Sequence, residues 1–166
     1  MKKINSIYIV LVSIVIVAST KATAQISKAE IRATGLTCSM CSNAINKQLK
    51  SLPEVVSVET DLNTNTFTVT LTEGNSLSPK VFKDKVEKAG FFIGTLILTT
   101  KAETIKQSDY VLINNVSNNN TEVKIQVLDK GYVTEREFKK LLKSLKNVAT
   151  YAFNNEDDFH IKIINK

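Results

Sequence analysis

Residues 34–45 read TGLTCSMCSNAI, and this short stretch contains both cysteines of the 166-residue chain, Cys38 and Cys41. It follows a segment in which apolar and polar residues alternate and leads into a segment with apolar residues at helical spacing. We therefore expect it to be a loop that joins a strand to a helix. Two thiols this close can form a disulfide, exchange electrons with another disulfide, or hold a soft metal ion.

The segments on both sides of the cysteine loop have clear patterns. Residues 28–34, KAEIRAT, alternate as a strand does, and residues 39–52 carry apolar side chains at helical spacing before Pro53 ends the helix. Residues 54–60 and 67–72 are expected to pair as a hairpin around a turn at residues 61–66.

A second helix and a closing strand follow. Ser78 is a suitable N-cap, Pro79 suits the first helical position, and Gly90 is placed to end this helix. Residues 91–98, FFIGTLIL, complete the order βαββαβ. This order predicts an α+β, ferredoxin-like fold, a four-stranded antiparallel sheet with both helices on one face. In that fold the cysteine loop lies at one edge beside Phe91.

The segment GLTCSMC at residues 35–41, in this position of a βαββαβ unit, resembles the heavy-metal-associated domain family, which includes copper chaperones and periplasmic mercury-binding proteins. The resemblance covers residues 27–100. It implies a metal carrier rather than an enzyme, with Cys38 and Cys41 as ligands. Cu(I) is the first candidate metal, and Hg(II) and Zn(II) are alternatives. The implied partners are a metal-transporting membrane protein or another acceptor with cysteines.

The chemistry of the residues agrees with metal binding. Thiolates are soft ligands that select Cu(I) and similar ions, and a helix N-terminus favours thiolate over thiol. Two ligands leave the ion open to a partner's cysteine, whereas structural zinc sites are closed by four ligands. Two alternatives stay open, a thiol–disulfide redox protein that uses the same pair and an adaptor in which the cysteines are merely bonded to each other.

The neighbours of the cysteines have ordinary structural roles in this interpretation. Leu36, where the family usually has Met, is expected to pack into the core, and Thr37 to cap the helix. Met40 is expected to point to solvent or to a docking partner rather than to the metal. Phe91 stands where relatives carry Tyr or Lys, and it can shield the site without offering a hydroxyl or a charge.

The N-terminus predicts export. A basic start, an apolar run at residues 6–19 and the small residues ATA at 22–24 are typical of a cleaved signal peptide over residues 1–24. The alternative, a retained anchor, needs an apolar run of about 20 residues. Cleavage removes three lysines and lowers the formal net charge from +6 to +3, too little to indicate nucleic-acid binding. We expect a soluble periplasmic or secreted protein.

The remainder of the chain predicts a connecting segment at residues 101–120, with a strand near 109–115, and a cysteine-free α+β module at residues 121–166. The module has the order βαββ, with strands at 123–129, 148–153 and 159–164 and a helix at 134–145. We interpret it as a degenerate copy of the first domain, completed by the strand at 109–115 and suited to docking a partner. The copy places Gly131 and Thr134 near the cysteine positions, and His160 is expected to be structural.

Overall fold

The computed structural model describes residues 25–37, 39–107, 110–114, 121–151 and 158–164. The expected signal peptide, residues 1–24, lies outside them. In the described part of the chain, no helix combines the length and the apolar character needed to cross a membrane. The elements, in chain order, are β1 (Ile26–Thr34), α2 (Ser39–Lys50), β2 (Val55–Asp61), β3 (Thr66–Leu71), α3 (Pro79–Lys88), β4 (Phe92–Lys101), α4 (Ala102–Gln107), β5 (Tyr110–Leu112), β6 (Glu122–Val127), α5 (Glu135–Ser144) and β7 (Phe159–Ile164).

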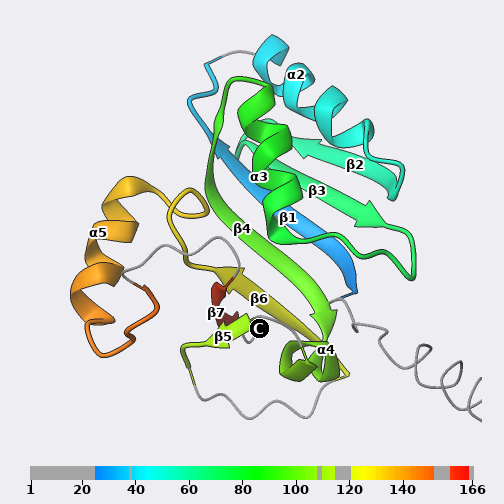
Figure 1. Cartoon of the computed structure of the whole chain (residues 1–166). Helices are drawn as coiled ribbons and strands as arrows, with labels where there is room; N and C mark the ends of the chain where they lie inside the picture. Colours follow the sequence, from blue (N-terminus) through cyan, green and yellow to red (C-terminus); the bar gives the residue numbers. More distant parts are fainter. Residues whose placement is uncertain (1–24, 38, 108–109, 115–120, 152–157, 165–166) are drawn as a thin grey trace, which may run out of the picture.

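The first six of these elements form the predicted βαββαβ unit. Their strands lie in the order β2-β3-β1-β4, and each neighbouring pair is antiparallel. Helices α2 and α3 lie side by side on one face of these strands (Figure 1). The ferredoxin-like prediction for this part of the chain is confirmed.

The main hydrophobic core lies between this face of the sheet and the two helices. Alternate residues of the strands and the inner residues of the helices are fully buried, as the spacing of apolar residues predicts. These residues include Ala29, Ile31, Ile45, Leu49, Phe67, Val69, Phe82, Val86, Leu96 and Leu98.

The sheet does not end at β4. Strand β6 pairs antiparallel with β4 over six residue pairs, β7 pairs with β6, and β5 lies parallel to β7 at the edge. The result is one seven-stranded mixed sheet with the order β2-β3-β1-β4-β6-β7-β5. Val123, Ile125, Val127 and Ile161 belong to the same core cluster as the first domain. The two parts of the chain therefore share a sheet and a core.

Two expectations for the C-terminal part are wrong. The strand near residues 109–115 does not complete a copy beside β6, because β4 already occupies that position and β5 lies beyond β7. Of the strand expected at 148–153, residues 148–151 form turns, with Val148 N–H bonded to the carbonyl of Leu145 and Tyr151 N–H to that of Val148. Residues 152–153 lie outside the described part.

These turns bury Tyr151 in a second, smaller core cluster with Leu128, Val133 and Phe138. The Tyr151 hydroxyl donates to the carbonyl of Leu128 at 2.7 Å, and its ring lies 5.7 Å from that of Phe138. Burial of this aromatic side chain against α5 stabilises the turn conformation of the segment.

Strands β1 and β6 occupy equivalent positions on the two sides of β4. Leu96 faces Ile31 on one side and Val127 on the other, and Leu98 faces Ala29 and Ile125, so that the two registers differ by 96 residues over residues 96–99 of β4. Both strands run antiparallel to β4, one on each side of it.

Helix α5 lies on the face of the sheet opposite to α2 and α3. Its Glu137 lines a shallow depression together with Glu30, Arg32 and Gln126, which point away from the main core.

Candidate metal site

The cysteine loop connects β1 to α2, and Gly35 begins it. Gly35 has φ of +86°, a left-handed conformation that glycine adopts without the steric cost of a side chain. Cys38 lies outside the described residues. Cys41 lies in the first turn of α2, where its side chain is half-buried. The predicted position of Cys41 at a helix start is thus confirmed, and that of the Cys38 side chain stays a prediction.

The connection between α3 and β4 lies beside this loop. A Cβ atom on Gly35 would lie 3.9 Å from Cδ1 of Phe91, and the Thr34 hydroxyl donates to the carbonyl of Phe92 at 3.3 Å. The predicted neighbourhood of the loop and Phe91 is confirmed. It follows from the pairing of Thr34 with Phe92, which brings the end of β1 to the start of β4.

The residues next to the cysteines are placed as the sequence predicts. Leu36 is half-buried and packs against the main core. The Met40 side chain is 81% exposed and points to solvent. The sequence alone did not draw attention to Phe92, which is 67% exposed at the same edge. The pair Phe91–Phe92 could have indicated this exposure, because neighbouring residues of a strand point to opposite sides.

The start of α2 is favourable for a thiolate. Its first turn contains no acidic residue, while basic residues stand in its last turn. The partial positive charge and the unpaired N–H groups of a helix N-terminus stabilise an anion there. Among the described residues, no group of three or more His, Cys, Asp or Glu side chains lies close enough to hold a metal ion.

The equivalent loop after β6 has the same backbone feature and different side chains. Gly131 has φ of +88° and stands 96 residues after Gly35, and α5 begins 96 residues after α2. Thr134 takes the position of Cys38, and its hydroxyl caps α5 by accepting the Glu137 N–H at 3.3 Å. In sequence, the neutral capping residue Thr134 thus stands in the C-terminal loop at the position equivalent to Cys38 in the cysteine loop.

His160 is a structural residue, as predicted. It is 1% exposed, and both ring nitrogens are engaged, Nδ1 with Asp129 Oδ1 at 2.7 Å and Nε2 with Thr150 Oγ1 at 2.8 Å. The His160 backbone N–H also donates to Asp129 Oδ2 at 2.7 Å. Burial raises the pKa of Asp129, and the hydrogen bonds from His160 oppose that rise. His160 therefore holds β7 to the end of β6.

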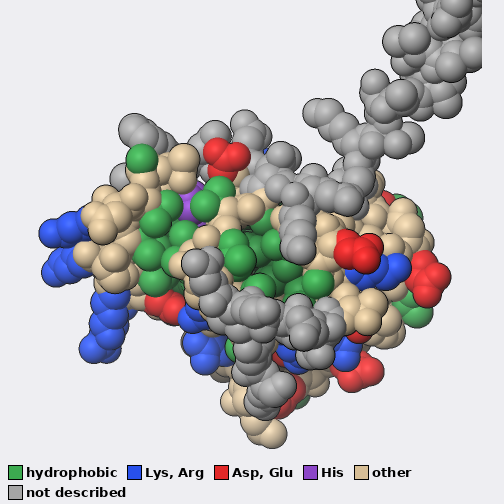
Figure 2. All heavy atoms as spheres, turned by 90° about the horizontal axis from the view of Figure 1, so that it is seen from below, with side chains coloured by type: hydrophobic (Ala, Val, Ile, Leu, Met, Phe, Trp, Pro, Cys, Tyr) green, Lys and Arg blue, Asp and Glu red, His purple; other side chains and the backbone are tan. Residues whose placement is uncertain are grey.

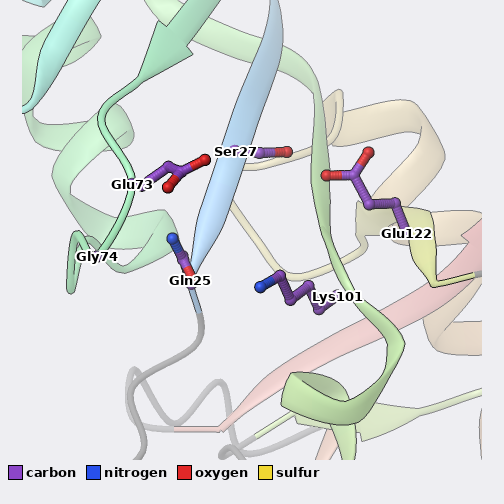
Figure 3. A pocket seen from close by; sticks show the side chains of 6 residues that line it. All are labelled: Gln25, Ser27, Glu73, Gly74, Lys101 and Glu122. Atoms are coloured by element: carbon purple, nitrogen blue, oxygen red, sulfur yellow. The ribbon is translucent and has the colours of Figure 1, made fainter.

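A second depression lies at the other end of the sheet. It is lined by residues from the starts of β1 and β6, the end of β4 and the segment after β3, namely Gln25, Ser27, Glu73, Gly74, Lys101 and Glu122 (Figure 3). Because β1 is nine residues long, this depression is roughly 25–30 Å from the cysteine loop. It is not part of the candidate site.

Residues 30–92 match the family model of the heavy-metal-associated domain. No curated protein gives a significant sequence match to the chain.

Among solved structures, the yeast copper transporter domain Ccc2a, studied in apo and Cu(I)-loaded states, is 34% identical. The match covers 41% of this chain and 89% of Ccc2a, with a TM-score of 0.36. A copper-binding domain from HMA7, a P-type ATPase, is 30% identical over 39% of this chain and 85% of that domain, with a TM-score of 0.36. The CopZ metallochaperone is 21% identical over 40% of this chain and 98% of CopZ, with a TM-score of 0.37.

A heavy-metal-associated domain is a metal-binding module and not a catalyst, as the sequence predicted. The match with the heavy-metal-associated domain family covers residues 30–92 of this chain, which contain the cysteine loop.

Proposed function

We propose that the chain binds a soft metal ion, Cu(I) before Hg(II) or Zn(II), between the thiolates of Cys38 and Cys41, and that it carries out this function after export to the periplasm or out of the cell. The observation that carries the proposal is the position of Cys41 in the first turn of α2, within the matched domain. The N-terminal end of the helix supports the charged form of a soft ligand, and soft ligands favour Cu(I).

The surroundings of the loop support transfer of the ion rather than permanent storage. Two thiolates do not complete a coordination shell, so an incoming cysteine of an acceptor can add to the ion before the original ligands leave it. Met40 and Phe92 provide exposed apolar surface at the same edge. Exposed apolar surface beside the cysteine loop suits contact with an acceptor protein, because docking there buries this surface and shields the bound metal from water.

The test is an anaerobic titration of the reduced chain from Gln25 onward with Cu(I), in competition with a chromophoric chelator. We expect one equivalent to bind, and we expect Cys38→Ser and Cys41→Ser each to abolish stoichiometric binding. Met40→Leu is the matched control within the same loop, and it should bind like the wild type because the Met40 side chain points to solvent. The same competition with Hg(II) and Zn(II) ranks the metals.

The rival function gives a different result in the same experiment. If no stoichiometric metal binding is found while the cysteine pair cycles readily against glutathione, the pair exchanges electrons and the carrier proposal is wrong. If the pair is oxidised and cannot be reduced under mild conditions, the cysteines have a structural role only.

A further inference from the structure

The outer face of α5 carries four positive side chains and no negative one. Arg136, Lys139, Lys140 and Lys143 are all exposed, and their spacing of i, i+3, i+4 and i+7 places them within about 100° of the helix circumference. We call these four residues the basic stripe. Phe138, at the centre of the opposite side, is buried in the second core cluster. The basic stripe therefore faces directly away from the protein, and Figure 2 shows Lys and Arg side chains projecting where α5 lies.

The net positive charge of the exported chain is concentrated on this helix and its flanks. Residues 130–146 contain six basic and two acidic residues, a formal charge of +4, whereas the chain from Gln25 onward carries +3 in total. The rest of the exported chain is thus close to neutral. Lys130 and Lys146, which flank α5, are exposed as well.

A helix surface that only needs to be soluble does not require this pattern, as α3 of the same protein shows. In α3 the basic residues alternate with Asp84 and Glu87, and Lys80, Lys83 and Lys88 each stand four residues from an acidic one. In α5 the members of the basic stripe are neighbours of one another, and like charges at these spacings destabilise a helix. An anionic surface brought against the stripe removes that repulsion.

We propose that the basic stripe docks the protein on an anionic phospholipid bilayer. The four members of the stripe are charged and none is aromatic, whereas protein interfaces and surfaces that bind single-stranded nucleic acids rely on aromatic anchors. A planar surface with distributed negative charge fits it, because each Lys or Arg can approach a different lipid headgroup. Leu142, 36% exposed beside the stripe, adds a small apolar contact. Docking by α5 leaves the cysteine loop, on a different part of the sheet, free to meet an acceptor.

The experiment measures co-sedimentation of the chain from Gln25 onward, which contains every described strand and helix, with vesicles of phosphatidylcholine containing about 30 mol% phosphatidylglycerol, an anionic lipid. No metal is added, so the result does not depend on the proposed metal function. Each Lys or Arg near such a surface contributes roughly a fivefold change in binding. Replacement of all four stripe residues by Gln is expected to weaken binding on the order of several hundredfold, and binding by the wild type should fall steeply with salt.

A control variant carries the same loss of charge elsewhere. It replaces four exposed lysines of α2 and α3 by Gln, namely Lys47, Lys50, Lys80 and Lys88. We expect it to lose much less binding than the stripe variant, and far-ultraviolet circular dichroism confirms that both variants are folded. A further variant with Lys139, Lys140 and Lys143 replaced by Arg should bind like the wild type. Equal losses of binding in the stripe and control variants would overturn the proposal. It would also be overturned if the wild type did not bind anionic vesicles at low salt, and an acidic protein would then be the partner to seek.

Discussion

Replacement of Ile125 by Ala should destabilise the whole protein and not only its C-terminal part. Ile125 is fully buried on β6 and belongs to the core cluster that also contains the residues packed under α2 and α3. The substitution removes three carbon atoms, about 2.4 kcal/mol at about 0.8 kcal/mol each. The cavity that remains raises the expected loss of unfolding free energy to about 3–4 kcal/mol.

Urea unfolding of the chain from Gln25 onward measures this effect with two local reporters. The chain has no Trp, and Tyr110, Tyr132 and Tyr151 all follow β4, so tyrosine fluorescence reports on the C-terminal part. The reactivity of the Cys41 thiol reports on the metal-binding part. With a slope of about 2 kcal/mol per molar urea, both midpoints should fall by roughly 1.5–2 M.

The two reporters should move together because β4 is hydrogen-bonded on both sides, to β1 and to β6. Leu62→Ala is the control, since Leu62 is 56% exposed and its loss should change the unfolding free energy by less than about 0.5 kcal/mol. If the tyrosine midpoint falls while the thiol midpoint keeps its wild-type value, the two parts unfold independently and the reasoning from a shared core is refuted.

Three further predictions concern single contacts. Gly94→Ala should lower the free energy of unfolding by about 1–3 kcal/mol, because the added Cβ would lie 2.6 Å from the Thr34 methyl group. Thr34→Ser removes that methyl group, so the double variant should recover most of the lost stability in thermal unfolding. His160→Leu removes the hydrogen bonds that oppose the raised pKa of Asp129, so the folded-state pKa of this carboxyl should rise further. The variant should therefore be most stable below the ordinary pKa of 3.8 and lose stability as the pH rises through the higher folded-state value. Near neutrality its free energy of unfolding should be about 3–5 kcal/mol below that of the wild type. If the free energy of unfolding of the variant, measured with urea, does not change between about pH 3.5 and 7, this account of Asp129 is contradicted. Lys124→Ala breaks only a partly exposed ion pair with β1, and double-mutant analysis should find a coupling below about 1 kcal/mol that shrinks with added salt.

The described part of the candidate metal site was predictable because it depends on residues that are close in sequence. Gly35, Cys41 and the start of α2 lie within seven positions, and local rules for turns and helix starts place them. The roles of Leu36 and Met40 were predicted for the same reason. The exposure of Phe92 was not predicted, because the side of the sheet that a residue faces at the start of a strand depends on how that strand pairs.

The C-terminal part was harder to predict because long-range contacts decide it. Residues 148–151 have the composition of a strand, yet they form turns because Tyr151 fills the space under α5. The polar partners of His160 come from segments 31 and 10 residues away, at Asp129 and Thr150. Short apolar segments of this kind adopt whichever structure buries them best.

The sequence by itself determined the βαββαβ order, the position of the cysteine loop before α2 and the residues of the main core, since each depends on a local pattern of spacing and capping. Only the tertiary structure decided that the sheet continues through β4 into β6, that β1 and β6 share one register on that strand, and that α5 lies on the opposite face. These features depend on hydrogen bonds and contacts between segments that are distant in sequence. No local pattern encodes which strand a free sheet edge will accept, because every edge offers the same backbone groups.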